Sequence, residues 1–193
     1  MLDSVDAISY TIKGRRYIRV TELLRARGLV DFSKIPKRMR SYYMARGTGS
    51  HKLWEDVERG IDDQYDYDPV VETYRAGHTR FLAETGFKAI PGGIEKRVHS
   101  DELRIAGTID RLGTIQGKLV LLDYKTSKVY PSTAIQCALY LLCLPEYQFH
   151  EVKRYGVAMM KDGKYKMSKE YPLSDKDLSL WHVSEYWKEA KGE

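Results

Sequence analysis

Cysteine and long apolar runs are both scarce in this chain. Cys137 and Cys143 are the only cysteines among 193 residues, and they lie six positions apart in a segment with helical periodicity. Residues with that spacing face different sides of a helix, so neither a disulfide nor a metal pair is expected between them. The longest apolar run, Cys137–Leu144, is far shorter than a membrane span, and the first ten residues contain no signal-peptide core. We therefore expect a reducing cytoplasm and no membrane attachment.

The remaining composition is that of a globular domain. The hydrophobic fraction is 42% and the charged fraction is 31%, which is ordinary for a protein with its own core. No internal repeat, low-complexity tract or linker divides the chain, so we expect one domain over residues 1–193.

Turn and capping residues divide the first half of the chain into a hairpin and a set of helices. Alternating polarity around Lys13-Gly14 predicts a β-hairpin. Four helices are expected. The first runs from an N-cap at Thr21 to Gly28, and the second from Pro36 to Arg46. The third runs from an N-cap at Ser50 to Gly60, and the fourth from Pro69 to Gly86. Residues 20–86 are thus predicted to form a helical arch or entrance region.

The second half changes to strand periodicity and predicts a catalytic core over about residues 88–170. Three successive strands are expected over 92–100, 102–115 and 117–127, the last two joined by a tight turn at Gln116-Gly117. A helix should follow over 132–144, then a strand pair around Asp162-Gly163 and an amphipathic helix over about 174–190. This order predicts an α/β fold with a mixed sheet and a crossing helix.

Charged residues stand at the tip of an apolar strand. Leu119–Leu122 is followed by Asp123 and Lys125, and pairing about the predicted turn sets Asp123 near Asp110 on the preceding strand. Two carboxylates that close repel each other unless a cation lies between them, and a hard divalent cation is their natural partner. Lys125 lies on the same strand face as Asp123, where it can contact a phosphate or orient water. A surface Asp–Lys pair is the alternative, since this spacing alone is common.

Four short motifs occur in a single order along the chain. They are Gly47–His51, Gly107–Asp110, Asp123–Lys125 and Gln136–Tyr140. Their order resembles that of the PD-(D/E)XK nuclease superfamily, and specifically its RecB-like branch. That branch includes small phage-type exonucleases, the mitochondrial genome maintenance exonuclease and CRISPR-adaptation nuclease domains. The resemblance implies a restriction-endonuclease-like core, with a mixed sheet flanked by helices, here preceded by a helical N-terminal half.

The resemblance also implies a role for each motif. His51, Asp110, Asp123 and the backbone carbonyl of Tyr124 would bind Mg²⁺ or Mn²⁺. Asp110, Asp123 and Lys125 would be catalytic, with Lys125 positioning the water or stabilising charge on the phosphate. Glu95 is a candidate additional acid, and Gln136 and Tyr140 would line the site and contact DNA.

Structural alternatives stand beside these roles. His51 would otherwise pair with Glu55 one turn on, and Glu95 would be an exposed strand glutamate next to Lys96 and Arg97. Gln136 and Tyr140 would form a polar stripe on the crossing helix. The remaining histidines and the tryptophans are predicted to be structural: His78, His99, His150, His182, Trp54, Trp181 and Trp187.

The charge distribution indicates an anionic partner. The net charge is +5, and residues 33–47 contain five basic side chains, two tyrosines and no acid. Basic residues interleaved with aromatics suit phosphates and exposed bases, although a solvated helix face would look the same. DNA-binding candidates in this stretch are Lys37, Arg38, Arg40 and Arg46.

Together these features predict a divalent-metal-dependent deoxyribonuclease, and the RecB-like resemblance favours an exonuclease acting on single strands or DNA ends. Alternatives are a structure-specific endonuclease, a non-cleaving DNA-binding module, and a subunit active with a protein partner in recombination or replication. Two cysteines cannot hold the four-cysteine iron–sulfur cluster of some branch members. A phage source would place the protein in the host-cell cytoplasm.

Overall fold

The computed structural model describes residues 2–5, 9–31, 33, 35–126, 128–147 and 150–172. The helix predicted over 174–190, together with Trp181, His182 and Trp187, lies outside these residues. The described elements, in chain order, are β1 (Leu2–Val5), β2 (Ser9–Ile12), β3 (Arg15–Arg19), α1 (Val20–Ala26), α2 (Lys37–Arg59), η1 (Asp62–Gln64), α3 (Pro69–Glu72), α4 (Arg75–Thr85), β4 (Lys88–Ser100), β5 (Ile105–Ile115), β6 (Lys118–Thr126), α5 (Ser132–Leu141), β7 (Lys153–Met159) and β8 (Tyr165–Met167).

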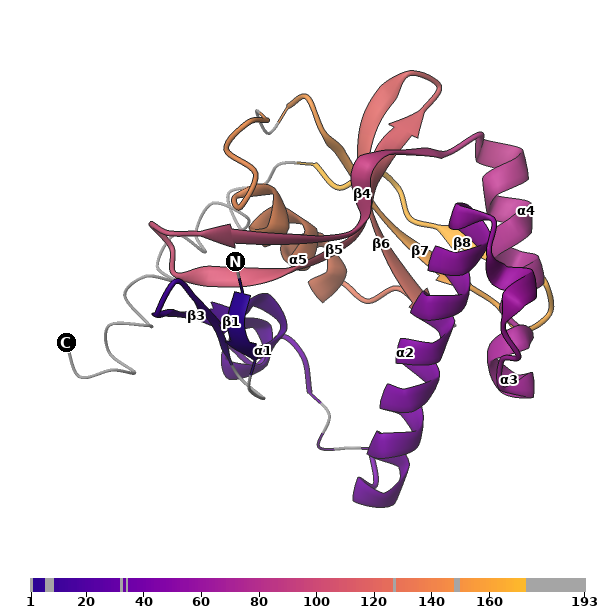
Figure 1. The fold of residues 1–193 in the computed structure, drawn as a ribbon, viewed down its shortest axis with the longest axis horizontal. Coiled ribbons are helices and arrows are strands. Elements are labelled where there is room, and N and C mark those ends of the chain that lie inside the picture. Colours follow the sequence, from indigo (N-terminus) through magenta and orange to yellow (C-terminus); the bar gives the residue numbers. More distant parts are fainter. Residues whose placement is uncertain are drawn as a thin grey trace.

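The predicted mixed sheet is confirmed. Its strands follow the order β1-β2-β3-β5-β6-β7-β8, and β4 pairs with β5. The β3–β5 and β6–β7 pairs are parallel and the others are antiparallel. One apolar cluster joins the sheet to α1 and α5, and a second joins it to α2 and α4. Helices therefore flank the sheet, and α2 and α4 lie together beside β6–β8 (Figure 1).

The two predicted hairpin turns are also confirmed. Lys13 and Gly14 have φ values of 50° and 71°, and Gln116 and Gly117 have φ values of 50° and 75°. Two consecutive left-handed residues form the turn that matches the twist of antiparallel strands. The second turn sets the β5–β6 register that brings the two acidic motifs together.

Several predicted helix boundaries are wrong. The helices expected before and after Gly47–Gly49 are one helix, α2, and Ser50 is buried inside it rather than capping a new one. A side chain at Gly49 would lie 3.0 Å from Val71, so this glycine lets α3 pack closely against α2 and does not break the helix. Thr21 lies within α1, whose N-cap is Arg19.

Further along, the single helix predicted from Pro69 to Gly86 is divided into α3 and α4. Gly60 and Gly86 do end their helices as predicted, each in the left-handed C-cap conformation. β1 pairs with β2 although its sequence was not predicted as a strand. These differences change the boundaries of the helical region but not its position before the catalytic core.

The central irregularity of the sheet lies in the middle of β5. On the edge opposite β4, β5 pairs with β3 at Ile105 and Ala106, and with β6 from Arg111 to Ile115. Among the described residues, Gly107–Asp110 falls between these two ladders. The strands on this edge separate there, which leaves room for side chains in place of a backbone partner.

Gly107 is needed because Tyr140 of α5 packs over this gap. A Cβ atom at Gly107 would lie 2.5 Å from Cε1 of the Tyr140 ring. Tyr140 is itself buried against the sheet. The tyrosine ring therefore occupies the space that any other residue at position 107 would fill.

We expect Gly107→Ala to lower the free energy of unfolding by about 1–3 kcal/mol, because the added methyl group displaces a packed ring. Gly47→Ala is the matched control: a Cβ atom there meets nothing within 4 Å. Alanine should stabilise that helical position by about 0.5–1 kcal/mol. Urea unfolding of the three proteins checks this, and the packing argument fails if both variants change stability in the same direction.

Candidate functional site

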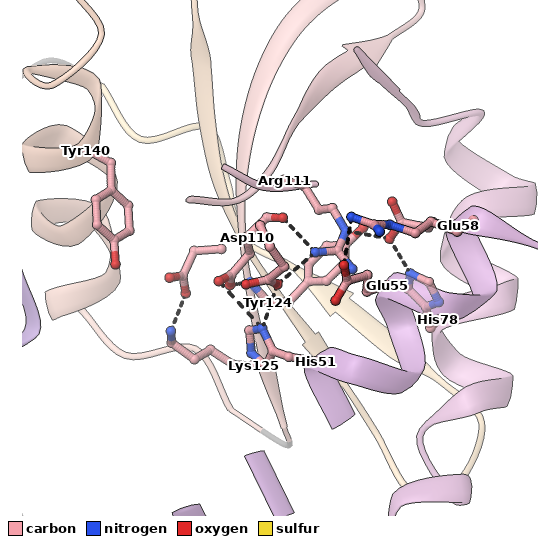
Figure 2. Close-up of polar contacts among 12 residues, drawn as sticks. His51, Glu55, Glu58, His78, Asp110, Arg111, Tyr124, Lys125 and Tyr140 are labelled. Atoms are coloured by element: carbon pink, nitrogen blue, oxygen red, sulfur yellow. Dashed lines mark hydrogen bonds and ion pairs between the residues drawn. The ribbon is translucent and has the colours of Figure 1, made fainter. Parts of the chain in front are cut away.

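Two acids meet at the gap in the sheet. Asp110 ends the unpaired stretch of β5, and its Oδ2 accepts a hydrogen bond of 2.7 Å from the backbone N–H of Tyr124 on β6. Asp123 is 1% exposed, and its Oδ2 lies 2.5 Å from Nζ of Lys125. The side chain of Asp110 thus replaces a missing backbone pair between β5 and β6. Figure 2 shows this acid between Lys125 and the helix-borne side chains.

His51 and Glu95 complete the same cluster from α2 and β4. Nδ1 of His51 lies 3.4 Å from Oε1 of Glu95 and 3.5 Å from Oδ1 of Asp110. One ligand atom from each of these three residues lies within 4.8 Å of the other two. Glu55, the alternative partner of His51, pairs with Arg59 at 2.7 Å instead.

The backbone of Glu95 is unusual for a strand residue. Its φ is 48°, in the left-handed region that costs a non-glycine residue about 1–2 kcal/mol. Its carboxylate contacts Arg111 as well as His51. Such strain persists where the surroundings impose it, and it is common at functional sites.

Behind the acids lies a buried ionic network that sequence reasoning missed. Arg111 is 0% exposed; its Nε donates to Oε1 of Glu58 at 2.7 Å and its Nη1 donates to Oε1 of Glu95 at 3.0 Å. The same Glu58 oxygen lies 2.9 Å from Nε2 of His78 on α4, and the guanidinium stacks over the Tyr124 ring (Figure 2). The available signal was a charged residue directly after Asp110 in an apolar strand.

The pKa values of the site reflect burial and mutual attraction. Burial raises the pKa of Asp110 to about 6; His51 opposes this shift and Asp123 adds to it. Burial alone would lower the pKa of His51, but Asp110 and Glu95 outweigh it and the pKa is raised. Burial would lower the pKa of the Lys125 ammonium group, but the nearby carboxylates of Asp123 and Asp110 outweigh burial and raise this pKa.

The charges in this cluster do not balance without a cation. Its carboxylates are Glu58, Glu95, Asp110 and Asp123, and its permanent cations are Arg111 and Lys125. Two negative charges therefore remain when the histidines are neutral, and buried charge without compensation is costly. Oδ1 of Asp123 is buried without a hydrogen-bond partner among the described residues. Carboxylates with one imidazole are a donor set suited to a divalent cation, Mn²⁺ in particular.

The two motif residues of α5 lie beside the acids. Nε2 of Gln136 donates to Oη of Tyr140 at 3.1 Å, and the Tyr140 ring covers Gly107. Burial, followed by the charges of Asp110 and Asp123, raises the pKa of Tyr140 well above its usual value. The hydroxyl is therefore neutral at physiological pH and acts as a hydrogen-bonding group at the wall of the site.

The four predicted DNA-binding residues differ in their surroundings. Lys37 and Arg38 are exposed at the start of α2, and Nε of Arg40 donates to the Ile35 carbonyl at 3.0 Å. Arg46 reaches the end of β6, with Nη2 3.4 Å from Oγ1 of Thr126. The basic stretch thus begins in solvent and ends at β6.

Comparison with protein families agrees with this geometry. The family model described as the PD-(D/E)XK nuclease superfamily matches residues 38–187, which include all four motifs. The chain therefore belongs to the PD-(D/E)XK nuclease superfamily, and its mixed sheet with flanking helices is the restriction-endonuclease-like α/β fold. Membership implies a nuclease that uses divalent metal ions. No curated protein matches the chain.

Two further findings bear on the sequence predictions. Cys137 and Cys143 are both buried free thiols. In the described part of the chain, no helix combines the length and apolar character needed to cross a bilayer. The prediction that Trp54 and His78 are structural agrees with their complete burial, and His78 in addition belongs to the Arg111 network.

We expect Arg111→Met to lower the free energy of unfolding by about 3–5 kcal/mol, because it leaves Glu58 buried without its cation. Replacing both partners, as Arg111→Met with Glu58→Leu, should recover part of this loss because Glu58 is then no longer a buried charge without its cation; Glu95 still loses its contact with Arg111, so the recovery is incomplete. Chemical denaturation of the single and double variants measures both effects.

Arg80→Met is the matched control for this pair. Arg80 binds Glu84 through an exposed i,i+4 contact, so its loss should change stability little. An Arg111→Met protein as stable as the Arg80→Met protein would show that the buried network does not hold the fold together.

Mn²⁺ affinity should rise between about pH 5 and 7. The raised pKa values of Asp110 and His51 mean that the metal-free site holds protons that the metal must displace. For the same reason, Asp110 contributes stability to the metal-free protein that is present below pH 3.8, the ordinary pKa of this group, and is lost as pH rises through about 6, because folded Asp110 holds its proton over that range and unfolded Asp110 does not. Isothermal titration in buffers of different ionisation enthalpy should detect proton release, and pH-independent binding would contradict the account.

Proposed function

We propose that this protein is a divalent-metal-dependent deoxyribonuclease that hydrolyses phosphodiester bonds. The observation that carries the proposal is the cluster at the gap in the sheet, where Asp110, Asp123 and Lys125 meet His51 and Glu95. With both histidines neutral, the four carboxylates of the cluster outnumber Arg111 and Lys125, and a divalent cation would compensate this excess of negative charge. Membership of the nuclease superfamily supplies the class of chemistry.

In this proposal each residue has a distinct task. Asp110, Asp123 and His51 would hold a divalent cation, with Glu95 as an additional acid. Such a cation would polarise the scissile phosphate and lower the pKa of a water molecule. Lys125 remains protonated because of its raised pKa, so it can orient the attacking water and offset negative charge developing on the phosphate.

The Tyr124 carbonyl is proposed as a further ligand. Its backbone N–H donates to Asp110 across the gap. In an extended strand the N–H and C=O of one residue point to the same edge, so this carbonyl is directed toward the same acids. Gln136 and Tyr140 would contact the DNA from α5.

The mode of cleavage belongs to the proposal as well. We place the protein in the RecB-like branch, as an exonuclease acting on single strands or DNA ends, with Mg²⁺ or Mn²⁺ as cofactor. A structure-specific endonuclease is the main alternative, and a non-cleaving DNA-binding module is the second. The intact set of acids, lysine and histidine favours an active enzyme. The proposal also includes a cytoplasmic location, which would be in the host cell if the source is a phage. It further includes a protein partner in recombination or replication.

The test is cleavage of end-labelled linear and covalently closed circular DNA, single- and double-stranded, with Mn²⁺, Mg²⁺ or EDTA. We expect metal-dependent loss of linear DNA alone, and Lys125→Ala should reduce the rate by about a hundredfold or more. Lys161→Ala, which changes an exposed lysine outside the site, should cleave like the unmodified protein.

Each other outcome has a definite meaning. Cutting of circles would replace the exonuclease with an endonuclease. Retention of DNA without cleavage under any metal would favour the binding module. Full activity of Lys125→Ala, or activity in EDTA, would overturn the catalytic assignment.

A further inference from the structure

The first turns of α2 extend beyond the body of the protein. All buried residues of this helix come from its second half: Ser50, Leu53, Trp54 and Asp56. By contrast, residues 41–45 are exposed without interruption. Figure 1 shows this end of α2 pointing away from the sheet. These five residues form about 1.4 turns of helix that are available to a partner.

Two tyrosines stand on this exposed segment. Tyr42 is 45% exposed and Tyr43 is 39% exposed, and their rings meet edge to face with centroids 5.6 Å apart. The guanidinium of Arg46 lies 5.0 Å from the centre of the Tyr43 ring. Arg46 and Tyr42 thus hold Tyr43 in place, while large parts of both rings remain in water. Neighbouring exposed aromatic rings on a charged helix are typical of a binding surface.

The basic residues of this segment favour an anionic partner. Residues 33–47 carry five basic side chains and no acid, and both Lys37 and Arg38 are exposed. At its other end, Arg46 contacts Thr126, the residue that follows Lys125. The basic and aromatic segment therefore reaches the end of β6, the strand that also carries Lys125.

A cleft lies beside Tyr42. It has a volume of about 250 Å³ and is lined by Tyr42 and Arg46 on one side and by Asp66 and Asp68 on the other. Carboxylates repel a phosphate chain but accept hydrogen bonds from the amino groups of bases. A nucleic acid bound here would keep its backbone on the basic side and turn its bases toward the tyrosines.

We infer that Tyr42 and Tyr43, flanked by Lys37, Arg38 and Arg46, form a binding surface for single-stranded nucleic acid that leads to the catalytic site. Every unpaired base offers a face on which a tyrosine can stack, whereas a duplex hides these faces. The surface therefore selects single strands by stacking, and its basic residues bind the phosphates of either form. This inference rests on the proposed nuclease function for its biological meaning, but the binding can be measured without cleavage.

The test is fluorescence anisotropy in EDTA with a labelled oligothymidylate and a labelled blunt duplex of equal length. The double variant Tyr42→Ala/Tyr43→Ala should lose about a hundredfold in affinity for the single strand and less than about twofold for the duplex, since stacking on each ring contributes about tenfold or more. Alanine preserves the helix, which circular dichroism verifies. Tyr42→Phe/Tyr43→Phe retains both rings and should bind like the unmodified protein.

Tyr65→Ala is the control for loss of an exposed aromatic side chain elsewhere. Tyr65 is 50% exposed next to Lys52 but lies outside the basic stretch, and its loss should leave both affinities unchanged. Two results would overturn the inference. One is a single-strand affinity of the double alanine variant within about twofold of that of the unmodified protein. The other is an equal loss of affinity for the single strand and the duplex. If binding depends on the tyrosines but no DNA is cleaved, the nuclease proposal is wrong and this inference stands. If DNA is cleaved but binding does not depend on the tyrosines, this inference is wrong and the nuclease proposal stands.

Discussion

The geometry of the site depends on the contacts made by one buried group, the guanidinium of Arg111. It joins Glu58 of α2, Glu95 of β4 and the Asp110 carbonyl of its own strand, and it stacks on Tyr124 of β6. Because an unpaired charge in this position would be strongly destabilising, α2, β4, β5 and β6 are fixed relative to one another. Glu58 follows His51 by two turns on one face of α2, so the contact that fixes Glu58 also directs His51 toward the acids.

The gap in β5 converts this rigid frame into a site for chemistry. A continuous ladder would have occupied the edge at Gly107–Asp110, but the pairing of β5 with β3 ends at Ala106 and its pairing with β6 starts only at Arg111. Asp110 is then buried beside Asp123 with limited compensation, and its pKa rises to about 6. The same burial that makes the free acids costly makes a divalent cation favourable there, because attraction between charges strengthens as water is excluded. Burial of the acids and the proposed metal binding thus have the same structural cause.

Local signals in the sequence were sufficient for the strands after β1, the hairpin turns and the four motifs. The turn at Gln116-Gly117 set the register that places Asp110 near Asp123. Two things lay beyond such signals. The continuity of α2 through Gly47 and Gly49 depends on tertiary packing against Val71, which no local propensity contains. The pairing of Arg111 with Glu58 joins residues 53 positions apart, so only the unexpected charge in an apolar strand hinted at it.

The central claim is that the acids at this gap hold a divalent cation. The most direct measurement is anomalous diffraction from a crystal of the protein containing Mn²⁺. The account predicts an anomalous peak within about 2.0–2.3 Å of oxygens from both Asp110 and Asp123, which is the ligand distance of a hard divalent cation, with His51 also bound. Ordered Asp110 and Asp123 side chains with no peak between them, at saturating Mn²⁺, would contradict it.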